Sequence, residues 1–543
     1  MQGLMQITPL TTNMIFRRAE TYWGTRRVAT RTALGIERMT VAEVASEARR
    51  VAGALESLGL AADARVGSFA WNTARHLALY FAVPGTGHIL HTVNIRYYPE
   101  QIVYSVNHAE DEALFVDRSL VPLLGRMLPR LPTVRHVIVM DDGAKADIPE
   151  DARIVDYEEL VGRSAEVDFV DLATDEDQAA ALCYTTGTSG SPKGVLYSHR
   201  SIWLHSNAGL SAFTSRITDA DNVLPVVPMF HAMAWGLPYT AMSAGASITM
   251  PGPDLSPAGL LDLIASERVT YAAGVPTIWM GMLPLLGDYD VSSLQRVMCG
   301  GSAVPRSLSE GWRKAIGVPI TQGWGMTETS PVASMSTLRS EFAGATADEL
   351  AEVRATAGIS LAGLEMRIAD TDTGELLPWD DKSTGEVQVR GPWVARQYFR
   401  TDGPGEQFTE DGWLRTGDVG AISPLGYLRL VDRTKDLVKS GGEWISSVEI
   451  ENLIMGHPKV AEAAVIAVPH PKWMERPLAC VVVRPGEELG RDEVLAFLGE
   501  HLSRWQVPDD VVFIDEIPKT SVGKFSKRTL RERFADHRLP TPE

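Results

Sequence analysis

Hydrophobic residues in the first 355 positions alternate between short continuous runs and segments with helical spacing. Runs typical of buried strands occupy residues 66–70, 113–116, 136–140, 179–184, 223–227 and 297–299. Helical patterns lie between several of them, at 44–58, 257–267 and 307–316. Thr40 and Glu43 have capping-box spacing before the first helix, and Gly59 stands where its C-terminal cap would be. Strands that alternate with helices predict α/β layers with parallel sheet.

The pattern changes near residue 355. Short β-like runs with Gly and Asp turns follow, at 365–368, 385–390 and 427–430. Beyond residue 432 a compact mixed pattern predicts helices at 447–455 and 491–502 and strands at 460–468, 478–483 and 510–514. We therefore expect an α/β protein with a large N-terminal domain of α/β layers plus a β-rich subdomain (residues 1–431). A small mobile α+β C-terminal domain (residues 432–543) is expected to follow. Residues 341–356 are expected to form a surface helix, and residues 271–287 a buried turn followed by a short helix.

Composition and charge narrow the class of protein. With 45% hydrophobic and 22% charged residues, the chain is neither disordered, collagen-like nor a coiled coil as a whole. Its net charge of −18 repels a phosphate backbone, so no nucleic-acid partner is expected. Cys183, Cys299 and Cys480 are far apart, which disfavours disulfides or a zinc module and favours a reducing cytoplasm. No signal peptide is expected. The longest nearly uncharged run, 271–287, holds two prolines and three glycines, which argues against a membrane span.

The segment from Tyr184 to Gly194 (YTTGTSGSPKG) is the strongest candidate for chemistry. It follows an apolar strand and contains three glycines, several hydroxyls and one lysine. Such a loop can direct backbone N–H groups and hydroxyls at one anion, and Lys193 adds a positive charge for phosphate. No Gly-Lys-Ser/Thr ends it, so it is not a Walker loop. A flexible Ser/Gly surface loop is the alternative, which the preceding strand and the following Lys-Gly disfavour.

This segment resembles the phosphate loop of the adenylate-forming superfamily, which includes acyl-CoA synthetases, luciferases and the adenylation domains of peptide synthetases. The resemblance covers about residues 30–535. Residues 228–235 (PMFHAMAW) and 439–446 (KSGGEWIS) are most similar to medium- and long-chain fatty acyl-CoA synthetases. The resemblance implies that the protein uses ATP and Mg²⁺ to activate a fatty acid to acyl-AMP. Transfer to coenzyme A then gives acyl-CoA, AMP and pyrophosphate.

The resemblance also implies a set of nucleotide-binding residues. They are Thr185, Thr186, Gly187, Thr188, Ser189, Gly190, Lys193, Gly301, Ser302, Gln322, Gly323, Trp324, Gly325, Thr327, Asp418, Arg433, Lys435, Lys439 and Trp444. Trp324 is expected beside adenine, where the family usually has Tyr; either ring can stack. Thr327 is expected on the α-phosphate, and Asp418 on the ribose hydroxyls, which a carboxylate can accept through both oxygens. Glu328 and Thr185 are expected to hold Mg²⁺, which prefers hard oxygen ligands.

Three residues are expected to take part in catalysis by resemblance: Lys524, His231 and Glu328. A carboxylate must attack an anionic phosphate, and a cation between the two relieves their repulsion. The acid is expected to lie beside His231, Trp235, Gly300 and Gly323, with Trp235 resembling the gate of a fatty-acid tunnel. A purely structural role for His231 stays open. We assign no function to residues 395–399 (ARQYF).

The implied mechanism has two steps, with the C-terminal domain swinging about a hinge at Asp432 between them. Lys524 serves the first step and then leaves, and residues 439–444 face the site in the second. The alternatives are an acyl-AMP ligase that loads a carrier protein, a CoA ligase for a non-fatty acid, a luciferase-like oxygenase and a non-catalytic binding protein. The chain length of the acid is open, although Trp235 favours medium or long acids. A homodimer is expected by analogy.

Overall fold

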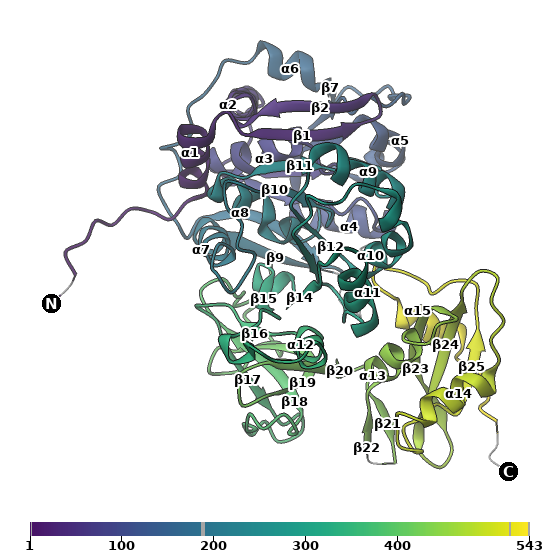
Figure 1. Ribbon diagram of the computed structural model, residues 1–543. Coiled ribbons are helices and arrows are strands. Elements are labelled where there is room, and N and C mark those ends of the chain that lie inside the picture. Colours follow the sequence, from purple (N-terminus) through teal and green to yellow (C-terminus); the bar gives the residue numbers. More distant parts are fainter. Residues whose placement is uncertain (2, 186–190, 442, 521–522, 541–543) are drawn as a thin grey trace.

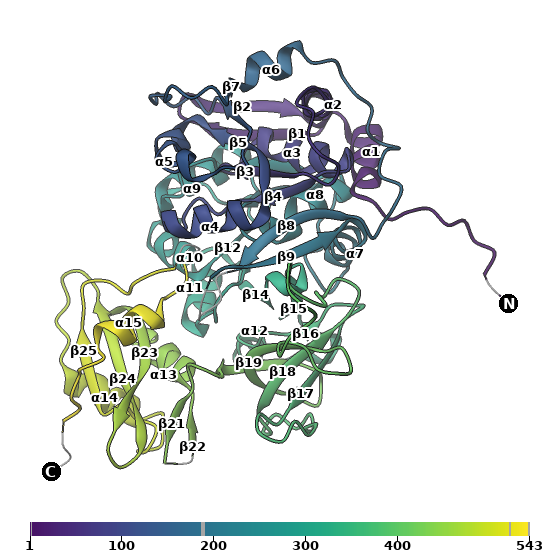
Figure 2. The same cartoon turned by 180° about the vertical axis from the view of Figure 1, so that it is seen from behind.

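The computed structural model describes residues 1, 3–185, 191–441, 443–520 and 523–540, and its large body is built on two sheets (Figures 1 and 2). The first is a seven-stranded sheet in the order β7 (Ile154–Asp156), β6 (His136–Met140), β5 (Asp111–Asp117), β3 (Arg65–Phe69), β4 (Ile89–Thr92), β8 (Ala179–Thr185) and β9 (Lys193–Ser198). Its pairings are parallel except that of β8 with β9. The chain therefore reverses direction between β8 and β9, at the predicted phosphate loop.

The second sheet has nine strands. Their order is β16 (Ile359–Ser360), β15 (Val332–Met335), β14 (Ile320–Gly325), β13 (Arg296–Cys299), β12 (Tyr271–Gly274), β10 (Asn222–Pro225), β11 (Ser247–Met250), β1 (Arg27–Thr32) and β2 (Gly35–Thr40). The strands from β14 through β1 are parallel, and the pairings of the outer strands β2, β15 and β16 are antiparallel. The parallel centre is the arrangement that the alternating sequence pattern predicts.

Helices fill the space between the two sheets and cover their outer faces. The central layer contains α1 (Thr12–Trp23), α2 (Val41–Ser57), α3 (Ala74–Gly85), α7 (His199–Gly209) and α8 (Leu237–Ala244), which share one hydrophobic cluster with strands of both sheets. Helices α4 (Pro99–Ala109) and α5 (Val121–Gly125) pack on the seven-stranded sheet, and α6 (Tyr157–Arg163) packs on α2. Helices α9 (Pro257–Glu267), α10 (Pro276–Met282) and α11 (Arg306–Ile316) pack on the nine-stranded sheet. Parallel sheets need both faces covered, and these layers provide that cover.

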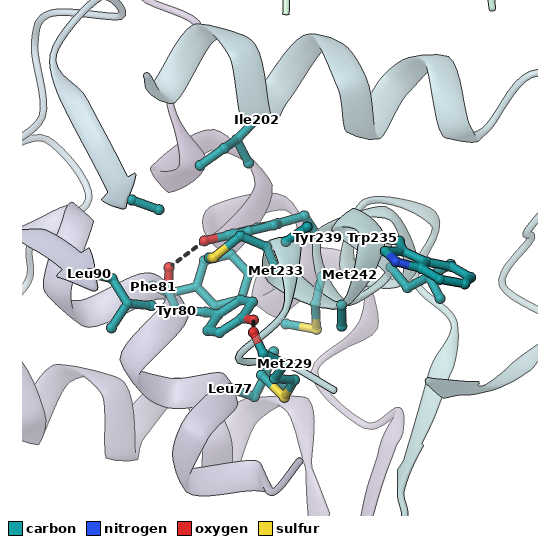
Figure 3. Close-up of a cluster of buried hydrophobic side chains, with 14 of the residues drawn as sticks. Leu77, Tyr80, Phe81, Leu90, Ile202, Met229, Met233, Trp235, Tyr239 and Met242 are labelled. Carbon is teal, nitrogen blue, oxygen red and sulfur yellow. Dashed lines mark hydrogen bonds between the residues drawn. The ribbon is translucent and has the colours of Figure 1, made fainter. Parts of the chain in front are cut away.

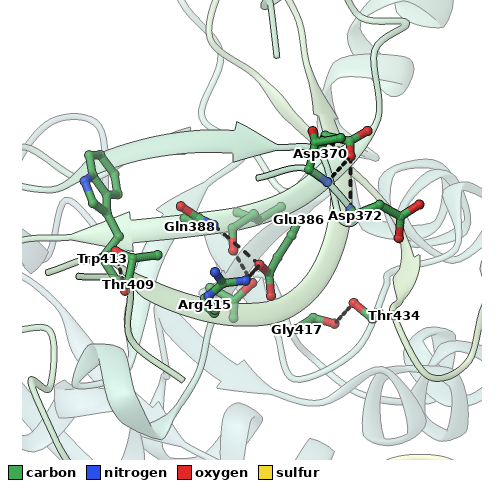
Figure 4. Close-up of polar contacts among 12 residues, drawn as sticks. Asp370, Asp372, Glu386, Gln388, Thr409, Trp413, Arg415, Gly417 and Thr434 are labelled. Atoms are coloured by element: carbon green, nitrogen blue, oxygen red, sulfur yellow. Dashed lines mark hydrogen bonds and ion pairs between the residues drawn. The ribbon is translucent and has the colours of Figure 1, made fainter. Parts of the chain in front are cut away.

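A smaller antiparallel sheet follows, in the order β17 (Glu365–Ala369), β18 (Gly385–Arg390), β19 (Leu414–Ile422) and β20 (Leu428–Arg433). Polar contacts support it: Arg415 Nη1 lies 3.3 Å from Glu386 Oε2 (Figure 4). The Thr434 Oγ donates to the carbonyl of Gly417 at 3.2 Å, so the chain that leaves β20 stays tied to β19.

The C-terminal segment has its own sheet and its own core. Its elements are β21 (Val438–Ser440), β22 (Glu443–Ile445), α13 (Ser447–Met455), β23 (Val460–His470), β24 (Met474–Val483), α14 (Arg491–Gly499), β25 (Asp510–Phe513) and α15 (Lys527–Arg533). Two hydrophobic clusters consist only of residues from Val438 onward. Figures 1 and 2 show this part beside the small sheet, joined to it through β20.

The predicted α/β class is confirmed, and many elements lie where the sequence places them. Helices α9 and α13 and strands β6 and β18 match the predicted bounds, and Thr40 and Glu43 form the expected capping box on α2. The charged segment 341–356 contains the mostly exposed α12 (Ala347–Arg354). The expectation for residues 271–287 was wrong at its start, because Tyr271–Gly274 is a buried strand that precedes α10. The predicted helix 491–502 ends at Gly499.

Among the described residues no helix combines the length and the apolar character that a bilayer crossing needs. The three cysteines are buried free thiols.

Candidate active site

The predicted phosphate loop lies at a hairpin between β8 and β9. Thr185 and Lys193 are cross-strand partners at its base. The candidates Thr186, Gly187, Thr188, Ser189 and Gly190 lie outside the described residues. The ammonium of Lys193 lies 4.6 Å from the centre of the Tyr398 ring. A cation is thus present at the base of the loop, in contact with an aromatic face.

The side chain of Asp418 is held from two sides. Trp324 Nε1 donates to its Oδ2 at 2.8 Å, and Arg433 Nε lies 3.1 Å from its Oδ1. Asp418 is buried, while the Arg433 side chain is 47% exposed. Charge of opposite sign on Asp418 raises the pKa of Arg433, which therefore stays cationic. These two donors fix the plane of the carboxylate, with both oxygens able to accept further hydrogen bonds.

Glu328 is buried and only half satisfied. Its Oε1 accepts a hydrogen bond from the Tyr398 hydroxyl at 2.6 Å, and its Oε2 has no partner among the described residues. Burial raises the pKa of Glu328, and the hydrogen bond from Tyr398 opposes that shift. A buried carboxylate with one free oxygen fits a cation. No group of three or more acidic, His or Cys side chains suited to a metal occurs in the described part of the chain. A Mg²⁺ ion here would therefore take its other ligands from phosphates, water and the hydroxyl of Thr185.

Lys524 reaches this region from the C-terminal segment. Its loop is closed by hydrogen bonds from Thr520 N to Lys524 O (2.6 Å) and from Lys524 N to Thr520 Oγ (3.1 Å). The loop contacts α10 through Thr277 Oγ, which donates to Gly523 O at 3.3 Å. A Cβ atom on Gly301 would lie 3.0 Å from Lys524 Cε, so this glycine (φ +88°) leaves room for the side chain. The C-terminal segment thus places a cation against the loop that follows β13.

Burial lowers the pKa of Lys524 to about 8, and the positive charge of Arg433 adds to the shift, whereas Asp418 and Glu328 oppose it. Burial lowers the pKa of His231 to about 3, and Lys524 contributes to that shift. Lys524 therefore lies within electrostatic reach of Asp418, Glu328, Arg433 and His231. At neutral pH His231 is uncharged and Lys524 is mainly cationic.

The segment that carries His231 and Trp235 is fixed by hydrogen bonds from neighbouring elements. Asn72 Nδ2 donates to the carbonyls of Pro225 and Val227, and Tyr80 OH donates to Met229 O at 2.6 Å (Figure 3). Residues 232–235 then form a left-handed turn in which each φ lies between +44° and +59°. This conformation costs about 1–2 kcal/mol for each residue other than glycine. Such strain at a candidate site is typical of functional segments.

Trp235 separates the loop at Gly300 from a cavity behind it. The Trp235 ring lies 3.2 Å from the position of a Cβ on Gly300. Beyond it is a narrow space of about 10 Å³, which is room for about one water molecule. Its lining is mainly apolar and consists of His205, Gly209, Thr214, Ser215, Trp235, Leu237, Thr240, Met298, Val332, Met335 and Leu361. A space this small admits a hydrocarbon group only after the lining side chains move, and its apolar lining then suits such a group.

Other predicted residues lie around this centre with different roles. Gln322 is buried, and its Oε1 accepts from Val304 N at 2.9 Å, so this atom supports the loop after β13. The backbone packs closely at the glycines of the same strand: a Cβ on Gly323 would lie 2.5 Å from Met298, and one on Gly325 1.9 Å from the carbonyl of Pro331. Thr327 is buried and Ser302 is exposed.

Two predicted nucleotide residues are not brought to this centre. Lys439 and Trp444 pair across the β21–β22 hairpin, with the Lys439 ammonium 4.6 Å from the Trp444 ring. Figures 1 and 2 show this hairpin at the end of the C-terminal part that lies farthest from α10. Lys435 lies nearer: burial lowers its pKa to about 8, and Arg433 and Asp418 act on it.

Tyr398 is the residue of this site that sequence reasoning missed. It contacts both Glu328 and Lys193, although it lies 70 positions from the first along the chain. In residues 395–399 the aromatic pair Tyr398-Phe399 is the feature typical of a buried position. The sequence does not show which residues this pair contacts.

Comparison with known proteins identifies the family of this chain. Residues 17–399 match the AMP-binding enzyme family and residues 449–524 match the AMP-binding enzyme C-terminal domain. The chain is 45% identical to a long-chain-fatty-acid–CoA ligase of Thermus thermophilus (96% of this chain, 95% of the relative). It is 42% identical to a 3-methylmercaptopropionyl-CoA ligase of Ruegeria lacuscaerulensis (99% of each chain). The structure is similar to ATP-bound MatB from Rhodopseudomonas palustris, with a TM-score of 0.83 and 26% identity over 97% of this chain and 99% of that one. This chain therefore belongs to the family of AMP-binding enzymes.

Proposed function

We propose that this protein is an AMP-forming acid–CoA ligase that activates a medium- or long-chain fatty acid. ATP and the carboxylate give an acyl-adenylate and pyrophosphate, and the thiol of coenzyme A then displaces AMP to give the thioester. The observation that carries the proposal is the convergence of Lys524, Asp418 and Glu328, which come from three separate segments, with Lys524 next to the loop that Trp235 contacts. Two of the similar proteins described above are CoA ligases by name, which supports the reaction class.

In the first step the chain's own residues hold two anions together. Asp418, oriented by Trp324 and Arg433, accepts the ribose hydroxyls. Lys193 and the loop at the end of β8 contact the phosphates. Lys524 lies between the carboxylate of the acid and the α-phosphate, where its charge counters the repulsion that grows as the bond forms. Mg²⁺, when bound by Glu328 and Thr185, supplies charge neutralisation for the phosphates.

The second step needs a thiol where Lys524 lies in the first. We propose that the C-terminal domain, residues 432–543, rotates about Asp432, so that Lys524 leaves and the β21–β22 hairpin with Lys439 and Trp444 approaches. His231, neutral at physiological pH, and Trp235 stay with the acyl group in both steps. Closure in each state keeps water from the reactive anhydride. A cytoplasmic location, supported by the three free thiols, and a homodimer belong to the same proposal.

A panel of acids tests the proposal directly. AMP release is measured with acids from acetate to stearate and with 3-methylmercaptopropionate, each with and without coenzyme A. We expect the highest kcat/KM with a medium or long fatty acid, and AMP release that depends on coenzyme A. A preference for 3-methylmercaptopropionate would favour the second candidate, a ligase for a short sulfur-containing acid, which the Ruegeria relative suggests. Acid-dependent pyrophosphate exchange with no AMP release on addition of coenzyme A would instead favour transfer to the thiol of a carrier protein, and the absence of both acid-dependent exchange and acid-dependent AMP release would refute the proposal.

The pH dependence of adenylate formation is a second prediction. The pKa of Lys524 is lowered to about 8, so Lys524 loses its proton as the pH rises through that value. We expect kcat/KM for acid-dependent pyrophosphate exchange to fall on the alkaline side of this pKa. In Lys524→Arg the guanidinium keeps its charge, so the alkaline limb should move to higher pH even if the rate is lower. An unchanged alkaline limb in Lys524→Arg would show that another group controls it.

A further inference from the structure

The segment 395–399, to which the sequence assigned no role, connects two parts of the candidate site. Ala395 N donates to the carbonyl of Glu328 at 2.7 Å, and Phe399 N donates to the carbonyl of Gly194 at 2.8 Å. Gly194 follows Lys193 on β9, and Glu328 lies in the short 3-10 turn Thr327–Thr329 after β14. The backbone of this segment thus joins the backbone at Glu328 to the backbone next to Lys193.

Tyr398 lies between these two backbone contacts and is 6% exposed. Its hydroxyl donates to Glu328 Oε1 at 2.6 Å, while the Lys193 ammonium lies 4.6 Å from the centre of its ring. Because the facing atom is a carboxylate oxygen, the Tyr398 hydroxyl is the donor of this hydrogen bond. One side chain therefore contacts both the anion proposed to hold Mg²⁺ and the cation proposed to contact phosphate.

We propose that Tyr398 is a positioning residue that keeps Glu328 and Lys193 apart and separately available to Mg·ATP. The inference rests on the proposed function. The charge of Lys193 acts on the Glu328 carboxylate, but the contacts described for these two groups are with Tyr398: its ring lies 4.6 Å from the Lys193 ammonium, and its hydroxyl donates to Glu328 Oε1. Opposite charges this close in a poorly solvated site would attract each other strongly if nothing lay between them. The Tyr398 ring contacts the Lys193 ammonium, and the Tyr398 hydroxyl donates to Glu328 Oε1. Glu328 Oε2 has no partner among the described residues.

The two contacts of Tyr398 can be removed in two stages. Tyr398→Phe deletes the hydroxyl and keeps the ring, whereas Tyr398→Leu deletes both. Tyr157→Phe is a matched control, because Tyr157 is also buried and its hydroxyl donates to Glu47 Oε1 at 2.6 Å, but it lies on α6 outside the candidate site. Each variant is titrated calorimetrically with ATP in excess EDTA and with ATP in excess Mg²⁺. The ratio of the two Kd values gives the contribution of Mg²⁺ to the affinity for ATP.

In Tyr398→Phe we expect the contribution of Mg²⁺ to ATP binding to fall about tenfold, because a hydrogen bond to a charged group is lost, with ATP binding in EDTA unchanged. In Tyr398→Leu, ATP binding in EDTA should weaken as well, by about three- to tenfold, since Lys193 loses the ring. The apparent KM for Mg²⁺ in pyrophosphate exchange should rise in Tyr398→Phe, and excess Mg²⁺ should restore kcat. Tyr157→Phe should match the wild type in every measurement.

Two results would overturn the role of Tyr398. One is an unchanged Mg²⁺ contribution in Tyr398→Phe. The other is an equal loss of ATP binding with and without Mg²⁺ in both variants, accompanied by a lower Tm, which is the result of lost packing alone. A wild-type protein that binds Mg·ATP but shows no acid-dependent exchange would refute the proposed function and leave the binding comparison intact.

Discussion

Lys524→Ala is expected to reduce acid-dependent adenylate formation by about three orders of magnitude and to leave thioester formation from supplied acyl-AMP within about twofold of the wild type. Two unit charges 4 Å apart repel by about 4 kcal/mol at an effective dielectric constant near 20, and this energy corresponds to about a thousandfold in rate. The Lys524 ammonium, which reaches Gly301 from the C-terminal segment, is the group proposed to counter that repulsion. Pyrophosphate exchange measures the first step, and AMP release from acyl-AMP with coenzyme A measures the second.

Lys519→Ala is the matched control for this experiment. Lys519 lies in the same loop, but its ammonium forms an ion pair with Glu462 at 2.8 Å and is 40% exposed, so its loss should leave both half-reactions near wild-type rates. Equal loss of both half-reactions in Lys524→Ala would contradict the separate roles proposed for the two domain arrangements. Retained exchange would remove Lys524 from the first step.

Asp432→Pro is expected to keep pyrophosphate exchange and to lose thioester formation. Asp432 lies at the end of β20, next to an irregularity in the β19–β20 register at Val419 and Gly420. Proline fixes φ, so a step that needs φ to change at this position becomes slower. An increase of about 3 kcal/mol in its activation free energy corresponds to roughly a hundredfold lower rate. The two half-reaction assays described for Lys524 measure the difference. Thioester turnover at the wild-type rate would place the hinge elsewhere.

The structure adds a control that the hinge experiment needs. Asp432 is buried, and its Oδ2 accepts hydrogen bonds from the backbone N–H of Ser447 at 2.7 Å and from the Ser447 hydroxyl, at the start of α13. Replacing Asp432 therefore removes these contacts as well as changing the backbone. Asp432→Ala removes the contacts alone, and we expect it to lower the free energy of unfolding by about 1–3 kcal/mol while both half-reactions continue. Loss of thioester formation in Asp432→Ala would assign the effect to the carboxylate and not to φ.

Much of the fold could be predicted because its signals are local. The capping box of Thr40 and Glu43, the helical spacing of α9 and the apolar run of β6 each depend on neighbours within a few positions. Helix α3 gave no such signal. Almost all of its residues are buried, because it lies between two sheets and other helices, so no polar face marks its period. Strand β12 was mistaken for a turn for a related reason, since a four-residue apolar run fits several structures.

The sequence by itself determined the family, the α/β layers and the residue types from which the candidate site is built, since motifs such as 184–194 and 322–331 are contiguous. Only the tertiary structure decided which partners these residues have: Trp324 with Asp418, Tyr398 with Glu328 and Lys193, and Lys524 against Gly301. Each of these contacts joins residues separated by tens to hundreds of positions. Hydrogen bonds and charge pairs act over a few ångströms in space, and only the packing of the sheets and the C-terminal segment brings such positions within that range.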